Sequence, residues 1–180
     1  MRTSFLVLLG VLFMQSAFAK LDSLDFPRDW QGKWLGELKI YSATGLQQNV
    51  AMELQILPLE NEGEFTWTII YGEDKEAGKR GYLLKTIDAS KGEYLIDEQN
   101  SILLESYVLG EKFFNRYDVM GNMILITLEQ QGKHLVFEVL SGKMDPVSIT
   151  GDTIFNEEEI PAVKTFPLRV YQKAVLGKVE

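Results

Sequence analysis

The stretch DWQGKWLGEL (residues 29–38) places Trp30 and Trp34 four residues apart, with Gly32 and Gly36 flanking the second tryptophan. A buried tryptophan removes on the order of 200 Å² of surface from water. Glycine permits a close backbone approach or a bulge within a strand. We expect the two tryptophans to seal one end of a β-barrel and the two glycines to let the chain enter and bend there.

The chain beyond this stretch alternates apolar and polar residues in short segments. Such a period of two, with one apolar face, is typical of half-buried antiparallel strands. In EFTWTIIY, for example, Phe65, Trp67 and Ile69 alternate with threonines. About ten segments follow this pattern, at residues 33–41, 50–57, 64–71, 80–88, 92–97, 101–109, 113–120, 123–129, 134–141 and 166–176.

Gly- or Asn-containing turns separate most of these segments, as in residues 60–64, 90–93, 120–122 and 130–133. Turns of this kind join consecutive hairpins into a meander. A long meander avoids exposed edges by closing on itself. The sequence therefore predicts an all-β fold, an antiparallel up-and-down β-barrel of about eight to ten strands, with a short helical turn in residues 21–30 capped by Asp22 or Ser23.

The first residues have the order of a secretory signal peptide. One arginine, an apolar run at residues 5–14 and the small-x-small sequence Ala17-Phe18-Ala19 follow one another. We expect residues 1–19 to be removed after Ala19, so that residues 20–180 form a single barrel domain that is secreted or periplasmic. An uncleaved N-terminal anchor is the alternative.

The composition limits the function. The chain has a formal net charge of −8, no cysteine and one histidine. An acidic chain repels nucleic acid and anionic membranes, and cysteine or histidine metal clusters cannot form. No metal or cofactor is expected, nor a transmembrane segment after signal cleavage, and we expect a monomer. Charged residues on the outward strand faces, such as Glu53 and Glu105, argue against an outer-membrane barrel.

The opening LDFPRDWQGKWLGEL resembles that of lipocalins, in the calycin superfamily, with Gly32 and Trp34 on the Gly-x-Trp of that pattern. The resemblance implies a barrel that carries a small ligand. It also implies that an arginine from a late strand covers the tryptophan through a cation–π contact. Arg169 is the first candidate for this role and Arg116 the second.

The last strand adds a second resemblance. Arg169 and Tyr171 form an Arg-x-Tyr pair similar to that of fatty-acid-binding proteins, where such a pair holds the ligand carboxylate. The two portal helices of those proteins are missing here, since only residues 42–48 separate the first two strands, and residues 156–166 are an addition. Arg169 is thus either a structural cover over Trp34 or a carboxylate clamp.

A third resemblance is to nitrobindin-type haem barrels, through Trp34-Leu35-Gly36-Glu37. Haem would need His134, which lies at a strand end beside a turn, so haem is not expected. Trp67, Tyr71 and Tyr82 are candidate walls of a ligand cavity. Arg116 could join them if it points inward, but the better core composition of the opposite face favours an outward Arg116.

Three functions remain open. The first is a non-catalytic barrel that binds a small hydrophobic or amphipathic ligand, possible ligands including fatty-acid-like molecules. The second is an interaction or structural barrel with a filled interior that recognises a protein through its loops. The third is an enzyme on the same scaffold. The acidic runs at residues 96–100 and 156–159 are interpreted as solvated turns. An interior void of a few hundred Å³ would favour the carrier over the filled barrel.

Overall fold

A computed structural model describes residues 25–179 and is all-β, with two isolated 3-10 turns. The signal peptide expected at residues 1–19 lies outside the described residues. The elements are η1 (Arg28–Trp30), β1 (Gly32–Ser42), β2 (Gly45–Ile56), β3 (Glu64–Tyr71), β4 (Lys79–Asp88), η2 (Ala89–Lys91), β5 (Glu93–Asp97), β6 (Leu103–Leu109), β7 (Lys112–Val119), β8 (Asn122–Gln131), β9 (His134–Lys143), β10 (Ser148–Thr150), β11 (Thr153–Phe155), β12 (Glu158–Ile160), β13 (Val163–Thr165) and β14 (Val170–Val179).

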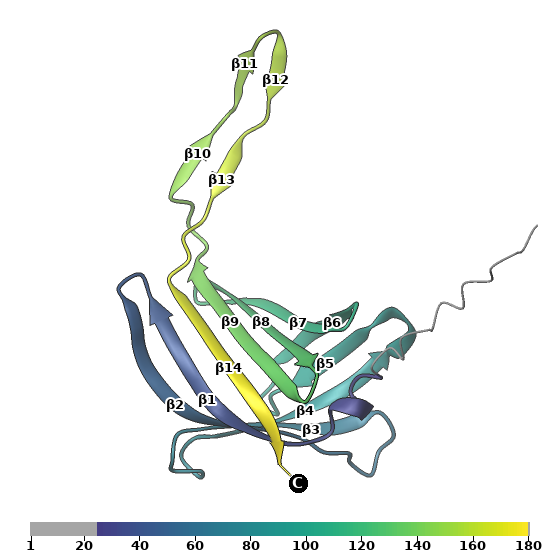
Figure 1. The fold of residues 1–180 in the computed structure, drawn as a ribbon. Coiled ribbons are helices and arrows are strands. Elements are labelled where there is room, and N and C mark those ends of the chain that lie inside the picture. The colour runs from purple at the N-terminus through teal and green to yellow at the C-terminus, as the bar shows by residue number, and fades with distance from the viewer. Residues whose placement is uncertain (1–24, 180) are drawn as a thin grey trace, which may run out of the picture.

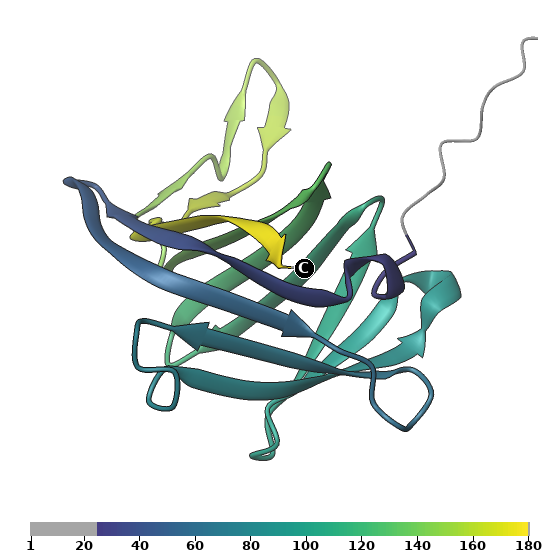
Figure 2. The same ribbon diagram turned by 60° about the horizontal axis from the view of Figure 1, so that its bottom comes forward.

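Ten of the strands form a closed antiparallel barrel in the order β1-β14-β9-β8-β7-β6-β5-β4-β3-β2 (Figures 1 and 2). Consecutive strands pair, except that β14 returns to lie between β9 and β1. The first strand therefore closes the barrel by pairing with both the second and the last. The predicted fold class and strand number are confirmed. Among the described residues, no helix is both long and apolar enough to cross a bilayer.

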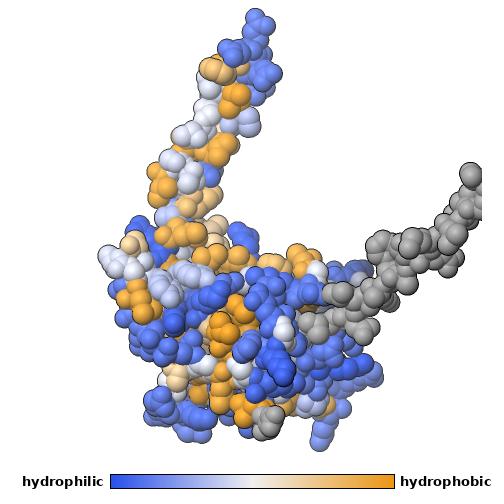
Figure 3. Space-filling view, in the orientation of Figure 1, coloured by the Kyte–Doolittle hydropathy of each residue, from blue (hydrophilic) through white to orange (hydrophobic). Residues whose placement is uncertain are grey.

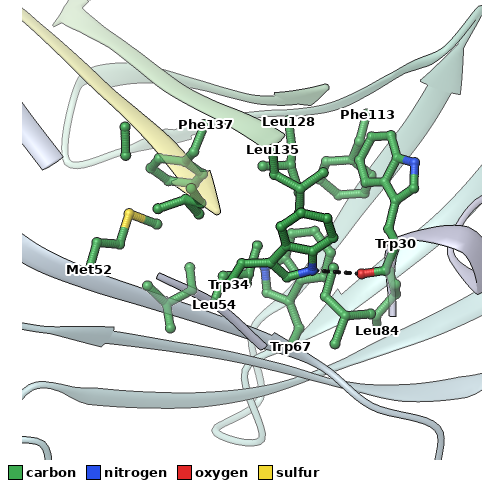
Figure 4. Packing of buried hydrophobic residues seen from close by; sticks show 14 of the residues in the cluster. Trp30, Trp34, Met52, Leu54, Trp67, Leu84, Phe113, Leu128, Leu135 and Phe137 are labelled. Carbon is green, nitrogen blue, oxygen red and sulfur yellow. Dashed lines mark hydrogen bonds between the residues drawn. The ribbon is translucent and has the colours of Figure 1, made fainter. Parts of the chain in front are cut away.

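One end of the barrel is filled by aromatic and aliphatic side chains (Figure 4). Trp30 and Trp34 are each about 1% exposed. The indole Nε1 of Trp34 donates a buried hydrogen bond of 2.9 Å to the carbonyl oxygen of Trp30. Leu128 and Leu135, both fully buried, belong to the same cluster. We call this the closed end, and it lies where the sequence placed it.

The short turn η1 holds the chain entry against this cluster. Phe26 packs edge-on against Trp30 and against Tyr94 of β5, at ring-centroid distances of 4.8 and 4.9 Å. The hydroxyl of Tyr94 donates a buried hydrogen bond to the carbonyl oxygen of Phe26. The predicted helical turn is therefore present as a 3-10 turn. Pro27, the N-cap residue just before the turn, makes no side-chain cap hydrogen bond, and the two predicted capping residues lie outside the described part of the chain.

The residue that covers Trp34 was predicted wrongly. In the β1–β14 register Trp34 lies opposite Lys178, whose Nζ is 5.3 Å from the centroid of the indole ring. Arg169 precedes β14 and so lies at the other end of the barrel, where its backbone N–H bonds to the carbonyl of Ser141. The antiparallel return of β14 brings its C-terminal residues, not its first ones, beside the start of β1.

The opposite end of the barrel, which we call the mouth, carries an extension that the sequence analysis did not recognise as structure. Residues 144–168, which we call the arm, connect β9 to β14 and contain the paired strands β10–β13 and β11–β12. Figure 1 shows the arm projecting away from the barrel. The acidic run at residues 156–159, interpreted as a solvated turn, forms the tip of this hairpin. The second strand also begins earlier than predicted, at Gly45.

A substitution at Gly36 tests the close packing of β1 against β14, the strand pair that closes the barrel. A Cβ at this position would lie 2.5 Å from the carbonyl oxygen of Val175 and 2.9 Å from the Leu176 side chain, whereas nothing lies within 4 Å of a Cβ at Gly177. Gly36→Ala is therefore expected to lower the free energy of unfolding by about 1–3 kcal/mol. Gly177→Ala, one strand away, should change it by about 0.5 kcal/mol or less. Urea denaturation of both variants measures this, and equal effects would contradict the close approach.

Candidate functional site

A cavity of about 110 Å³ occupies the mouth half of the barrel interior. It lies between the inner faces of β3, β4, β6, β7 and β8 and the end of β5. Aromatic and aliphatic side chains form its floor, and polar groups from the strand ends surround its opening. The lining residues are Trp67, Ile69, Tyr71, Arg80, Tyr82, Ile96, Glu98, Leu104, Phe113, Asn115, Tyr117 and Ile126.

Strand register brings these groups together. Trp67 of β3 lies opposite Tyr82 of β4, and Ile69 lies opposite Arg80. Directly opposed residues of an antiparallel pair share a face of the sheet. Tyr71, two residues beyond Ile69, therefore also faces inward. One sheet face thus supplies an aromatic floor at Trp67 and polar groups toward the mouth.

Three tyrosine hydroxyls line the cavity and make no hydrogen bond to any described residue. They belong to Tyr71, Tyr82 and Tyr117, all of which are partly buried. The guanidinium of Arg80 donates only to backbone carbonyls, that of Ala77 at 3.2 Å and that of Lys79 at 2.8 Å. Within residues 25–179, Arg80 forms no ion pair, although the cavity is also lined by a carboxylate. These donors are available to a bound molecule.

Asn115 is the fixed polar group of the cavity wall. It is 3% exposed, and its Nδ2 donates to the Ser106 hydroxyl at 2.8 Å and to the Glu105 carbonyl at 3.1 Å. Ser106 in turn donates to the carbonyl of Leu104. Since both amide hydrogens are used, the Asn115 side chain is held in one orientation between β6 and β7. It can offer its Oδ1 to the cavity without rearrangement.

The cavity keeps its phenols protonated. Burial raises the pKa of Tyr71 to about 12, and the neighbouring Tyr82 and Tyr117 contribute in the same direction. Burial and the charge of Glu98 also raise the pKa values of Tyr82 and Tyr117. Desolvation disfavours the phenolate, and a nearby carboxylate disfavours it further. At neutral pH all three hydroxyls are therefore hydrogen-bond donors rather than bases.

Of the predicted ligand-binding residues, three lie where expected. Trp67, Tyr71 and Tyr82 all line the cavity. Arg116 is exposed and faces outward, as the sequence favoured, because Phe113, Asn115 and Tyr117 occupy the inner face of β7. It therefore belongs neither to the cavity nor to the cover of Trp34.

The predicted carboxylate clamp does not face the interior. Ala174 and Leu176 are the buried, inward residues of β14. Tyr171 is an odd number of residues away from both, so it points outward. Arg169 is exposed. The Tyr171 hydroxyl donates to Glu138 on the outer face of β9, where Lys173 and Lys112 also pair with this carboxylate. The pair Arg169 and Tyr171 thus belongs to the outer surface, where Tyr171 stacks on Tyr41.

Arg80, Glu98, Asn115 and Tyr117 were not singled out from the sequence. The period-two pattern did place Tyr117 and Asn115 on the face of Phe113. If the pairing register of residues 64–71 with 79–85 had been assigned, it would have placed Arg80 opposite Ile69 and so among the cavity-lining residues. Glu98 was assigned to a solvated turn, and only the barrel closure shows that it lines the cavity.

The cavity, at about 110 Å³, is smaller than the few hundred Å³ that would favour a carrier with its ligand inside the barrel. Buried apolar side chains occupy much of the remaining interior, and Met52, Leu54 and Leu84 are each at most 2% exposed. An apolar void of about 150 Å³ can hold one benzene ring. A space of about 110 Å³ is smaller than this, so it admits the end of a chain but not a whole drug-sized molecule. His134 lies exposed at the closed end and is not among the cavity-lining residues.

Comparison with known proteins gives two similar solved structures. One is a protein of unknown function from the DUF3598 family of Nostoc punctiforme, with a TM-score of 0.56 and 12% identity over 84% of this chain and 48% of that chain. The other is the S-type phycobiliprotein lyase CPES of Guillardia theta, with a TM-score of 0.52 and 6% identity over 83% of this chain and 88% of that chain.

At these identities the likeness shows the fold alone. The chain spans about half of the length of the DUF3598 protein. No protein-family model matches the sequence, and no curated protein matches it. The comparisons therefore support the ten-stranded antiparallel barrel and assign no activity.

The raised pKa of Tyr71 gives a pH prediction. The difference in phenolate absorbance between the wild type and Tyr71→Phe reports this one hydroxyl. Its midpoint is expected near pH 12 in the folded protein and near pH 10 in denaturant. Since the unfolded phenol releases its proton first, stability should be unaffected below pH 10. It should then fall by up to about 1.4 kcal/mol per pH unit as the folded pKa is approached. A folded midpoint near pH 10 would contradict the buried position.

Proposed function

We propose that this protein is a calycin-like barrel that binds a small amphipathic molecule at its mouth without catalysing a reaction. The ligand inserts one chain-end or similarly small apolar group against the aromatic floor formed by Trp67 and Phe113. Its polar part remains at the strand ends beside Arg80 and the tyrosine hydroxyls. The proposed function differs in one respect from the carrier expected from the sequence. Most of the ligand is held at the opening of the barrel rather than enclosed in its interior.

The observation that carries this proposal is the convergence on one cavity of three hydroxyls without a described hydrogen-bond partner and of Arg80, whose guanidinium has further N–H groups beside those that bond to backbone carbonyls. Three phenols and Arg80 line a space whose floor is apolar. A small number of convergent polar groups over an apolar surface is the usual composition of a ligand pocket. A barrel whose interior serves only for packing would have aliphatic side chains at these positions.

The donors define the chemistry of the ligand. A guanidinium and three protonated phenols supply hydrogen-bond donors, so the polar end of the ligand carries acceptor oxygens such as those of a carboxylate or a carbonyl, and the acceptors Asn115 Oδ1 and Glu98 can bind a hydroxyl of the ligand. The negative charge of Glu98 at the same cavity disfavours a ligand with several negative charges. Trp67 and Phe113 pack against each other, with ring centroids 5.0 Å apart, and together form an aromatic floor on which a slender apolar group can lie.

The protonation state supports a binding role over an enzymatic one. A general base needs a pKa near the working pH, whereas the pKa values of the cavity phenols are displaced upward. Among residues 25–179, no group of three or more His, Cys, Asp or Glu could hold a metal ion. Turnover of any small ester or glycoside that depends on Arg80 or Tyr117 would overturn this assignment.

The proposal includes export. It rests on the signal-like sequence of residues 1–19. N-terminal sequencing of the mature protein is expected to begin at Lys20, and a chain that begins at Met1 in the exported fraction would contradict it.

Binding at the mouth can be tested with a neutral and an acidic amphiphile of the same apolar group, using quenching of tryptophan fluorescence as the signal. The acidic compound is expected to bind more tightly. Arg80→Gln should weaken its binding about tenfold or more, since a hydrogen bond to a charged group contributes about 1.5–3 kcal/mol. The neutral compound should lose much less affinity.

Arg116→Gln is the matched control, because Arg116 is exposed on the outer face beside Tyr117 and should leave binding unchanged. Leu104→Trp, which fills the cavity from its wall, should abolish binding of both compounds. Unchanged binding in the Leu104→Trp variant would place the ligand elsewhere. Native mass spectra without any bound molecule, together with no binding of either compound, would reject the proposal.

A further inference from the structure

Two charges of opposite sign line the cavity, and neither forms an ion pair with any residue in the described range 25–179. One is the exposed guanidinium of Arg80, and the other is the half-buried carboxylate of Glu98. The Glu98 carboxylate accepts one side-chain hydrogen bond from the described part of the chain, from Nδ2 of Asn100 at 3.3 Å. Partial burial of an unpaired charge costs free energy. A molecule that brings a positive charge to Glu98 would offset this cost.

The pairing of β4 with β5 places the two charges at different depths. Continuing their antiparallel register by one residue beyond Asp97 sets Glu98 opposite Tyr82. Arg80 lies on the same face of β4 as Tyr82 but two residues nearer the mouth, a step of about 6.6 Å. Tyr82 is also opposite Trp67 of the aromatic floor. Along the strands, Glu98 therefore lies closer to the floor and Arg80 closer to the solvent.

The loop before β4 holds the guanidinium of Arg80 apart from Glu98. Its Nη1 donates to the carbonyl oxygens of Ala77 and Lys79, which precede Arg80 at the mouth. Diagonal cross-strand neighbours such as Arg80 and Glu98 start about 7–8 Å apart. The remaining N–H groups of the guanidinium are free to bind an anion. The space between the two charges can thus receive a head group that carries both signs.

The surroundings of Glu98 suit a cation. Tyr82 and Tyr117 line the cavity with it. Burial raises the pKa values of both tyrosines, and the charge of Glu98 raises them further, so both phenols lie close to the carboxylate. Aromatic rings attract ammonium groups, and the attraction is stronger where water is excluded. A cation beside Glu98 would therefore meet a carboxylate and aromatic side chains together.

We propose that the polar head of the ligand is a zwitterion, in which an ammonium group lies between the apolar chain and an acidic group. The ammonium pairs with Glu98, and the acidic group reaches the guanidinium of Arg80 nearer the mouth. The reverse order, with the ammonium outermost, would set each charge beside a protein group of its own sign. This ligand class rests on the proposed function, which it narrows.

The arm is a second apolar surface that an amphiphile could contact. Figure 3 shows hydrophobic residues along it, and Ile154 and Phe155 are 75% and 66% exposed. Its outer half, residues 151–162, contains acidic residues and no basic one, so it offers no partner to an acidic head group. Leu104→Trp fills the cavity and leaves the arm unchanged, so this variant distinguishes the two surfaces.

Calorimetric titration with amphiphiles that share a decyl chain tests the order of the charges. The head groups are a carboxylate, a trimethylammonium, a dimethylammonioacetate (a betaine) and a phosphocholine, each used below its critical micelle concentration. The betaine has its ammonium next to the chain and should bind about tenfold more tightly than the carboxylate compound, because it adds an ion pair with Glu98. It should also bind more tightly than the phosphocholine compound, in which the order of the charges is reversed.

Two variants assign the charges to their partners. Glu98→Gln should weaken betaine binding about tenfold and leave binding of the carboxylate compound unchanged or tighter. Arg80→Gln should weaken both of these compounds and leave the trimethylammonium compound unchanged or tighter. Glu111→Gln is the matched control, because Glu111 is exposed in the turn between β6 and β7 at the closed end and should change no affinity.

Three results would overturn this inference alone. They are a betaine that binds no more tightly than the carboxylate compound, a preference for the betaine that survives Glu98→Gln, and equal binding of the betaine and phosphocholine compounds. In each case, binding of the carboxylate compound that depends on Arg80 would leave the proposed function intact. Unchanged binding in Leu104→Trp, or no binding of any of the compounds, would overturn both.

Discussion

The hydrogen bond from the Trp34 indole to the Trp30 carbonyl ties the entry of the chain to the closed end of this barrel. It joins the entry turn to the first strand at a distance of 2.9 Å inside the core. A hydrogen bond of this kind contributes only about 1 kcal/mol, but it positions two of the largest side chains of the closed end. The first strand, which starts at this end, pairs on both sides, with β2 and with β14, and so closes the barrel.

A filled closed end divides the interior into two parts with different roles. The half beside the tryptophans is packed to exclude water, and its side chains are aromatic or aliphatic (Figure 4). The half toward the mouth keeps a cavity whose wall includes phenols, an amide and an ion of each sign. In this account one end of the strands stabilises the fold, and the other end holds the groups proposed to bind a ligand. Burying the unpaired polar groups of the mouth costs free energy. The packed half of the interior offsets this cost.

The sequence predicted the fold well because the alternation is local. Trp67 and Tyr71 were placed on one strand face by period two, Tyr82 was a candidate for the cavity wall, and the better core composition of the opposite face favoured an outward Arg116. The failures came from long-range geometry. Lys178 and not Arg169 covers Trp34, because the direction of β14 decides which of its ends lies beside β1. Tyr171 faces outward for the related reason that Ala174 and Leu176 occupy the inner face. Glu98 was recognisable only after closure, and the arm was missed because its Asn-Glu tip lacks the usual glycine.

Xenon binding to crystals under gas pressure tests most directly the division of the interior into a packed closed end and a hollow mouth. Xenon occupies apolar voids without needing a specific chemical contact. The account predicts one xenon site between Trp67, Phe113 and Leu104, and none within the cluster around Trp30 and Trp34. Xenon density beside Trp34, or a mouth half that takes up no xenon, would contradict it.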